Sequence, residues 1–400
     1  MGNCFCQLHI HQDQNDLINK MEQPPGNNNS NSFFPKDLNS QLSNNSRQIK
    51  LKNSKTNKLE LNIKTKLLEL GHFIQYNDFK RLMGNEIVKI IQEEPFDYKK
   101  YISPPKIFPT NLNPFQFRES NDIYFGSWNQ EAEMEGKGIY YSYDKKITIE
   151  GFWVKGDNIC GRIFFTNKAI YQGEIMNSMP NGQGELFKGN QDRFIGTFKN
   201  GEIEKGVFIF GDDKTKYDGF FENGNFNGEG KMTWGNIIEY QGYFKNSMFS
   251  GKGKITLVID IDKKEEYEGG FNENEFHGKG KYCFNNGDIY EGDFEFGIKK
   301  GHGIYYRNDG DKIQFEGKWD DDFPNGNGVL TYNGYKLKGF WRNGDYMSSP
   351  EEENEIFNDI DKNIKPYKIS IFPSSLSHLN IGNSNISQYS QDYISNQFFY

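Results

Sequence analysis

The first six residues have the types and order that protein acylation requires. The chain begins with the sequence MGNCFC. A glycine after the initiator methionine is the site of N-myristoylation, although the usual pattern has Ser or Thr where this chain has Cys6. Cysteines beside such a glycine are sites of S-palmitoylation, and two lipid chains anchor far more stably than one. We therefore predict a lipid anchor on Gly2, Cys4 and Cys6.

Other chemistry has little support in the sequence. Cys4, Cys6, His9 and His11 could be read as zinc ligands, but their spacing is tighter than that of structural zinc sites. The stretch 224–231 resembles a phosphate loop, yet its spacing is wrong and Met232 stands where Ser or Thr is needed. The signatures of hydrolases, zinc proteases and kinases are not found. We expect no enzymatic activity, no metal and no cofactor.

Glycines and aromatic residues recur at a fixed interval in the middle of the chain. Of the 43 glycines, 38 lie between Gly126 and Gly344. The clearest units read aromatic-x-Gly-x-aromatic, then a turn, then Gly-x-Gly, whereas the copies that begin at 124, 194 and 315 are looser and the one at 149, which has Ile149 and Ile163 in place of an aromatic residue and a glycine, is degenerate. The units begin at residues 124, 149, 171, 194, 217, 240, 267, 290, 315 and 337, the last being a half-copy. Such a period is the signature of a repeat architecture.

The unit that begins at Tyr217 indicates what one repeat must look like. Alternate residues of a strand share a face, so Tyr217, Gly219 and Phe221 point the same way, with the glycine between two rings. The Asn223-Gly224 pair suits a tight turn. Each unit is therefore a β-hairpin, and hairpins must stack to bury their rings. The sequence predicts an all-β fold, an elongated and twisted single-layer antiparallel sheet, with a short helical N-terminal segment and disordered ends.

One face of this sheet carries the aromatic residues of the repeats. We expect them to pack the sheet, to bind a partner along a groove, or both. They are Tyr124, Trp128, Tyr171, Phe198, Tyr217, Phe221, Tyr240, Phe244, Tyr267, Phe271, Tyr290, Phe294, Phe315, Trp319 and Trp341.

The repeated unit resembles the MORN repeat, with about nine and a half copies over residues 124–345. The resemblance implies a groove-bearing sheet that acts as a scaffold or protein-binding platform. Members of that family often work at membranes, ciliary structures or the cell cortex, and some were proposed to bind phosphoinositides.

The charge of the chain limits its partners. The net charge is −8, and the repeat region has 28 basic against 35 acidic residues. An acidic surface is a poor partner for nucleic acid or anionic lipid. The exception is the block 47–66, with seven basic residues and one acid. It could assist the lipid anchor at an anionic membrane, or it could be a solvated linker.

Four regions follow from these patterns. Residues 1–55 hold the anchor candidate and a disordered spacer, and 56–123 a short helical segment and lead-in. Residues 124–345 form the ribbon, and 346–400 a disordered acidic and polar tail. Apolar spacing over 59–91 is helical, with Asn85 as a candidate N-cap, and this segment caps the first repeat, docks a partner or does neither.

The function that these observations favour is a scaffold or adaptor. We expect it at the cytoplasmic face of a membrane or at the cell cortex, where the repeats bind a protein partner and lipid contact by the repeats stays open. The alternative is a structural component of a ciliary, axonemal or cytoskeletal assembly. The sequence leaves open whether the chain is a homodimer.

Overall fold

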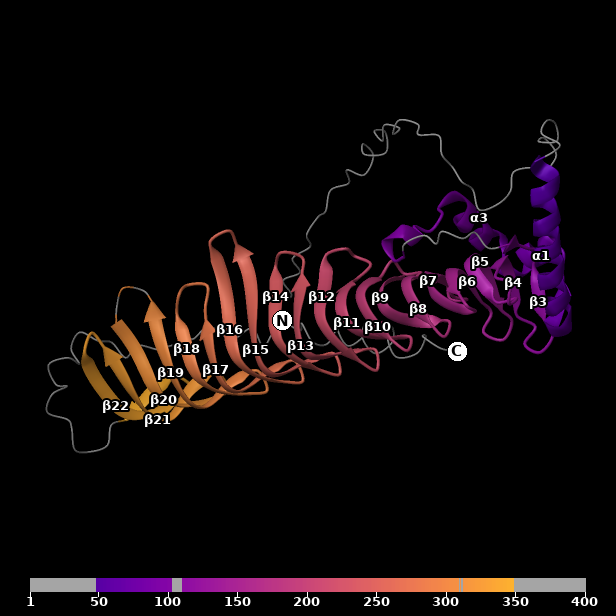
Figure 1. Cartoon of the computed structure of the whole chain (residues 1–400). Helices are drawn as coiled ribbons and strands as arrows, with labels where there is room; N and C mark the ends of the chain where they lie inside the picture. The colour runs from indigo at the N-terminus through magenta and orange to yellow at the C-terminus, as the bar shows by residue number, and fades with distance from the viewer. Residues whose placement is uncertain (1–47, 103–109, 309, 311, 349–400) are drawn as a thin grey trace, which may run out of the picture.

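The computed structural model describes residues 48–102, 110–308, 310 and 312–348. They form one antiparallel sheet of 23 strands with three α-helices and one 3-10 helix at its N-terminal end (Figure 1). The helices are α1 (Gln48–Leu70), α2 (Tyr76–Met83), α3 (Asn85–Glu93) and η1 (Tyr98–Lys100). The strands before the repeats are β1 (Gly71–Phe73), β2 (Thr110–Asn111) and β3 (Phe115–Phe117).

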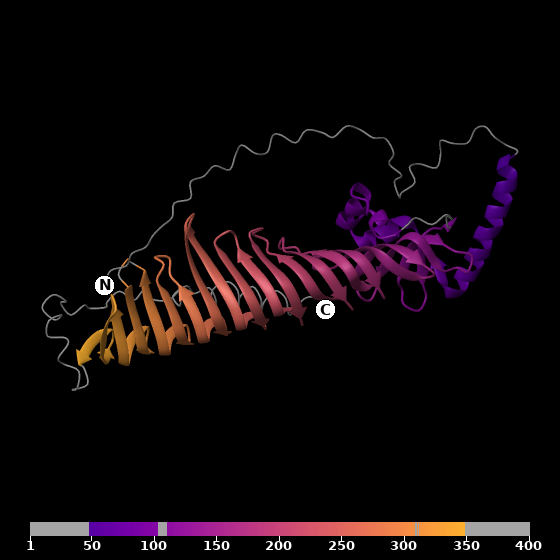
Figure 2. The same cartoon turned by 60° about the vertical axis from the view of Figure 1, so that its left-hand side comes forward.

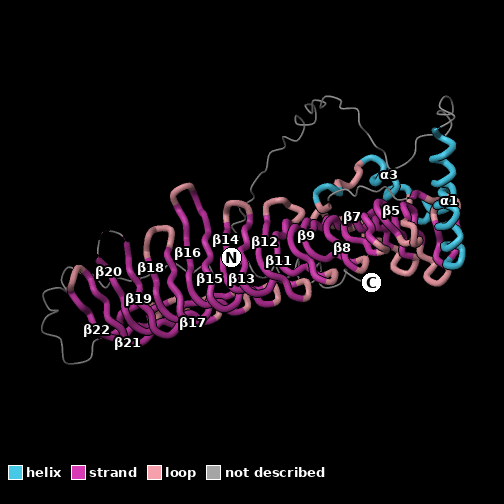
Figure 3. Tube along the Cα trace, in the orientation of Figure 1, coloured by secondary structure: helices cyan, strands magenta, loops and turns pink. Residues whose placement is uncertain are grey.

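The repeats supply strands β4 to β23, and each strand pairs with the next (Figure 3). They are β4 (Ile123–Trp128), β5 (Met134–Ser142), β6 (Ile147–Val154), β7 (Asp157–Phe164), β8 (Ile170–Met176), β9 (Met179–Phe187), β10 (Arg193–Lys199), β11 (Glu202–Ile209), β12 (Thr215–Glu222), β13 (Asn225–Trp234), β14 (Ile238–Lys245), β15 (Met248–Asp260), β16 (Lys263–Asn272), β17 (Glu275–Cys283), β18 (Ile289–Glu295), β19 (Ile298–Asn308), β20 (Lys312–Asp320), β21 (Phe323–Tyr332), β22 (Tyr335–Arg342) and β23 (Asp345–Ser348). These are ten hairpins, one for each predicted unit start. The predicted fold class is confirmed.

The turns have the geometry that their residues favour. Asn223 and Gly224 join β12 to β13 with φ values of 49° and 74°. Positive φ at both central residues matches the twist of the flanking strands, and Asn and Gly tolerate it best. The predicted turn role of this pair is therefore confirmed.

One continuous core holds the array together. A single cluster of buried side chains runs from Ile63 on α1 to Trp341 on β22. It lies on the face of the sheet that carries Tyr217, Gly219 and Phe221, which we call the ring face. The opposite side is the outer face. The sheet curves across its width and twists along its length (Figures 1 and 2), so the rings of neighbouring hairpins cover one another.

The N-terminal segment closes one end of this core. Ile63 and Leu67 of α1 are fully buried and belong to the ring-face cluster, which also contains Phe115 of β3 and Trp128 of β4. Strands β2 and β3 pair with β4, and β1 pairs with β3. Helix α1 lies against this end of the ribbon (Figure 2). The expectation that this segment caps the first repeat is confirmed.

The helices differ in detail from the sequence expectation. Helix α1 already begins at Gln48, so much of the basic block 47–66 is helical. The prediction of Asn85 as the N-cap of α3 is wrong. The N-cap is Gly84, and Asn85 is the first helical residue. Gly84 has a φ of 84°, where a residue with a Cβ is strained, and its N–H also closes the last turn of α2 on Lys80.

Candidate binding surface

The three units formed by β12 to β17 pack their rings in the same way on the ring face. In the unit of β12 and β13, Tyr217 lies edge-on to Phe221 with ring centroids 5.2 Å apart, and Phe226 stacks on it at 3.9 Å. Phe244 of the next unit lies edge-on to Tyr217 at 5.0 Å. The hydroxyl of Tyr217 donates to the carbonyl of Phe220 at 2.8 Å, which satisfies its one polar atom. Rings thus link these hairpins to one another.

The glycines of the unit make room for this tyrosine. Gly219 and Gly230 face each other across the strand pair. A Cβ on Gly219 would lie 2.4 Å from the hydroxyl oxygen of Tyr217, and one on Gly230 would lie 2.6 Å from its ring. Either is far inside van der Waals contact, so any side chain there would displace the ring. Burial raises the pKa of the Tyr217 hydroxyl, so it stays protonated.

The predicted aromatic-face residues are all brought together in this core. Each is at most 7% exposed: Tyr124, Trp128, Tyr171, Phe198, Tyr217, Phe221, Tyr240, Phe244, Tyr267, Phe271, Tyr290, Phe294, Phe315, Trp319 and Trp341. A partner could reach these rings only by displacing the packing that joins the hairpins. In the folded array these rings therefore offer almost no accessible surface.

One core position on the ring face carries a charge. Phe226, Phe249 and Phe276 stack on the tyrosines of their units, but the equivalent residue of the next unit is Lys299. Its Nζ lies 5.7 Å from the ring centre of Tyr290 and 3.8 Å from the carboxylate of Asp322. Burial lowers the pKa of Lys299 to about 8, against the opposing effect of Asp322. Sequence reasoning missed this buried ammonium, although the loss of the aromatic residue was a visible signal.

The chain itself covers the outer face over the first units. Phe79 and Met83 of α2 and Ile91 of α3 pack there against Ile139 and Phe164. Residues 96–102 then cross β6 and β7, where they bury an ion pair in which the Nε of Arg162 donates to Glu150 at 2.8 Å.

The segment that crosses β6 and β7 makes a defined ring contact. Tyr98 packs on Phe152 with ring centroids 6.1 Å apart. Lys137, the cross-strand neighbour of Phe152, places its Nζ 4.9 Å from the centre of the Tyr98 ring. Figure 3 shows the helices lying over this part of the sheet. The outer face is thus able to hold aromatic side chains.

Beyond this cover, the outer face exposes apolar side chains over β9 to β14. They include Phe187, Ile195, Phe220 and Tyr243. The first glycine of the Gly-x-Gly motif in β13, Gly228, lies beside this row, and a Cβ there would be 3.8 Å from the Cβ of Phe220. A contiguous exposed apolar patch of this kind is typical of an interaction surface.

A second exposed apolar feature is the tip of the β15–β16 hairpin. An insertion relative to the other units lengthens both strands, and Asp260 pairs with Lys263 at the end of the ladder. The hairpin rises above its neighbours (Figure 1). Its tip exposes Val258, Ile259 and Ile261, and Ile261 is 95% exposed.

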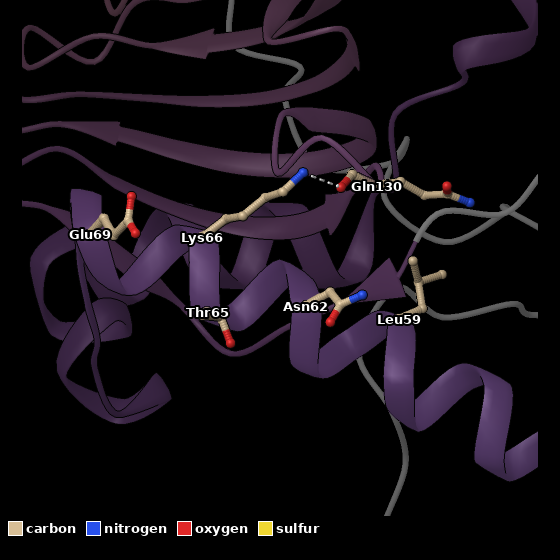
Figure 4. Close-up of a pocket in the computed structure, with 6 residues that line it drawn as sticks. All are labelled: Leu59, Asn62, Thr65, Lys66, Glu69 and Gln130. Carbon is tan, nitrogen blue, oxygen red and sulfur yellow. Dashed lines mark hydrogen bonds between the residues drawn. The ribbon is translucent and has the colours of Figure 1, made fainter.

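The surface of α1 holds a shallow open cleft of ≈ 370 Å³ beside the β4–β5 turn. Leu59, Asn62, Thr65, Lys66 and Glu69 line it from the helix and Gln130 from the turn (Figure 4). The Nζ of Lys66 donates to the Gln130 carbonyl at 3.0 Å, and Lys64 pairs with Glu60 at 2.6 Å. Two lysines of the basic block are therefore partly used inside the protein, whereas Lys58 is exposed.

The predicted lipidation residues Gly2, Cys4 and Cys6 lie outside the described residues. Within residues 48–102, 110–308, 310 and 312–348, the acidic, histidine and cysteine side chains form no cluster that could hold a metal ion. In the same part of the chain, none of the helices is both long and apolar enough to cross a membrane.

Known proteins support the repeat assignment. Six segments of the chain match the MORN repeat. They are residues 171–193, 217–236, 240–258, 267–289, 290–312 and 315–335. The units that begin at 124, 149, 194 and 337 are not matched, although they form the same hairpins. MORN repeats generally serve as protein- and membrane-interaction modules and are typically not enzymes.

No curated protein matches the chain significantly. Among solved structures, a similar one is the SAS-4 (dCPAP) TCP domain of Drosophila melanogaster in complex with a proline-rich motif of Ana2 (dSTIL). It shares 11% sequence identity, and the match covers 46% of this chain and 84% of that chain with a TM-score of 0.17. An overlap this weak carries no argument about function.

Proposed function

We propose that this protein is a non-catalytic scaffold that holds a protein partner at the cytoplasmic face of a membrane or at the cell cortex. The observation that carries the proposal is the single core from Ile63 to Trp341. It joins ten hairpins into one elongated surface and uses the rings of the repeat to do so. Stacked repeats of this kind present extended surfaces on which partners bind.

The projecting β15–β16 hairpin is the part of this surface that we assign to the partner. Val258, Ile259 and Ile261 form an apolar tip that rises above the neighbouring hairpins, and no packing inside the array needs the 95% exposed Ile261. An exposed apolar anchor is what a partner pocket can bury at the centre of an interface.

Proximity labelling with the full chain in its native cell tests this assignment. We expect Ile261→Ser to lose the main labelled proteins that the unchanged chain labels. The matched control is Tyr335→Ser, which alters another exposed side chain beside a hairpin turn, 61% exposed at the start of β22. Equal labelling by the unchanged chain and Ile261→Ser would reject the hairpin tip as the contact.

The membrane part of the proposal uses the N-terminal residues. Myristate on Gly2, palmitate on Cys4 and Cys6, and the basic block 47–66 would together hold the acidic ribbon at an anionic leaflet. Metabolic labelling with a clickable myristate tests the anchor. The anchor is supported if the unchanged chain is labelled and the Gly2→Ala variant is not. If the unchanged chain carries no label, or if the Gly2→Ala variant is still labelled, the anchor is rejected.

The alternative, a structural component of a ciliary or cytoskeletal assembly, is favoured by one observation. Helix α1 and β1 to β3 cover one end of the sheet, whereas at the other end β23 pairs with β22 only at Phe340, Trp341 and Arg342. Within the part of the chain that the structure describes, no strand pairs with the other edge of β23, and an unpaired edge is a template for pairing with another chain, which includes a second copy. Cell fractionation of the Gly2→Ala variant separates the two proposals. If this variant still pellets with the detergent-resistant cytoskeleton, the structural role is supported and the membrane scaffold is rejected.

A further inference from the structure

The outer face contains the same arrangement of side chains twice. On β4 to β6, Phe125 pairs with Ile139, and Lys137 pairs with Phe152. On β10 to β12, Ile195 pairs with Val207, and Lys205 pairs with Phe220. The register is identical, so a lysine beside a phenylalanine and an apolar cross-strand pair recur six strands further on. We call these the first seat and the second seat.

The first seat is occupied by the chain itself. Tyr98 lies on Phe152, and the Nζ of Lys137 lies 4.9 Å from the centre of the Tyr98 ring. Tyr76 and Phe79 of α2 pack on Phe125 with ring centroids 5.1 and 6.1 Å away. The seat thus binds rings through apolar contact and one cation–π contact.

The second seat has the same chemistry but is open. Phe220 is 43% exposed and Ile195 is 40% exposed, whereas Phe152 is 7% exposed. Among the described residues, no ring of another segment lies on Lys205, and its ammonium is 4.5 Å from the ring centre of Phe220. The second seat is also continuous with the covered surface, because Phe187 and Ile170 lie between the two regions on β9 and β8.

We propose that the C-terminal segment 386–400 of this chain occupies the second seat, with the ring of Tyr393 on Phe220 and Lys205. The segment contains five aromatic residues, namely Tyr389, Tyr393, Phe398, Phe399 and Tyr400. Tyr393 follows Asp392 as Tyr98 follows Asp97. Asp392 is the single charged side chain of the segment and is opposite in sign to Lys205.

The length of the chain permits this contact. The 45 residues from 348 to 393 can span up to about 150 Å. From β23 to β12 the array covers eleven strand spacings, or about 53 Å. A covalently linked segment reaches the seat at a high effective concentration, so a modest contact suffices. Docking of this segment would cover the second seat in the way that α2 and residues 96–102 cover the first seat. This contact is within one chain, so it is independent of the protein partner and of the membrane anchor proposed above.

Amine labelling of the full chain tests the proposal without altering the seat. We expect Tyr393→Ser to raise the rate at which Lys205 is acetylated about fivefold, the effect of losing about 1 kcal/mol of contact. Tyr367→Ser, a tail tyrosine outside the segment, is the control and leaves the rate unchanged. Equal acetylation of Lys205 in the unchanged chain and Tyr393→Ser would overturn the proposal.

A photo-crosslinker identifies what occupies the seat. With p-benzoylphenylalanine in place of Phe220 in the full chain, we expect mass spectrometry to find cross-links to 386–400 of the same chain. An equal mixture of isotope-labelled and unlabelled chains separates this from a second copy. Cross-links between copies, or none to 386–400, would overturn the proposal. An unchanged melting temperature of Tyr393→Ser shows that the array itself is intact.

Discussion

At the scale of single residues, the repeat depends on positions that carry no side chain. Gly242 lies on the ring face, where a Cβ would be 2.5 Å from the hydroxyl oxygen of Tyr240 and 2.6 Å from the Cα of Gly253. Gln241 points to the outer face and is exposed. We expect Gly242→Val to lower the free energy of unfolding by at least about 2 kcal/mol, and Gln241→Val to change it by less than about 0.5 kcal/mol.

Thermal melts of the full chain, followed by circular dichroism, compare these two variants. Both changes place the same β-branched residue in the same strand, and propensity alone would favour Gly242→Val because Gly is the poorer strand former, so a loss of stability in that variant reports the clash. Equal melting temperatures would contradict the assignment of the two faces.

Lys299 makes the stability of the protein depend on pH. Its pKa is about 8 in the folded protein and near 10.4 when exposed. Between these values the unfolded chain holds the proton more often than the folded protein, so the unfolding free energy rises with pH. The charged lysine thus costs stability at pH 7, on the order of 3 kcal/mol, and this cost disappears as the pH approaches 10.

The variant Lys299→Met removes this dependence. We expect it to be more stable than the unchanged protein at pH 7, because Met can pack among the rings of Tyr290 and Trp319. The difference in unfolding free energy between the two proteins should shrink as the pH rises from 7 to 10. Urea unfolding at pH 7 and at pH 10 measures this difference, and a difference that grows with pH would contradict the buried charge.

At the scale of elements, α1 stabilises one end of the sheet through Ile63 and Leu67, which lie on adjacent turns of the helix. Leu67 is fully buried in the core, whereas its neighbour Leu68 is 55% exposed. We expect Leu67→Ala to cost about 2–4 kcal/mol of local stability at this end and Leu68→Ala to cost little. Hydrogen exchange of β1, β3 and β4 reports on this end of the sheet. Faster exchange in both variants, or in neither, would argue against α1 as the cap.

At the scale of the whole molecule, the strand spacing fixes the length of the protein. The nineteen intervals between β4 and β23 amount to about 91 Å. A compact protein of 400 residues would have a radius of gyration near 21 Å. We expect small-angle X-ray scattering of the full chain to show the scattering of a rod-like particle and a radius of gyration clearly larger than this value. A value close to that of a compact sphere would exclude the ribbon.

The sequence by itself determined the repeated hairpin. The alternation of Tyr217, Gly219 and Phe221 places rings and glycine on one face, and Asn223-Gly224 is a turn on local grounds. These features depend on contacts within a few residues or with the next unit, so a pattern of period two and a fixed repeat length reveal them. The ten starting points of the hairpins follow in the same way.

Only the tertiary structure decided which surfaces are available. The rings that a sequence reader would offer to a partner are buried, because the curved sheet stacks each tyrosine against the next unit. The cover of the outer face by α2 and Tyr98 joins residues far apart in the chain, and no local pattern encodes that contact. The match between Lys137–Phe152 and Lys205–Phe220 became visible only once the strand register placed each lysine beside its phenylalanine.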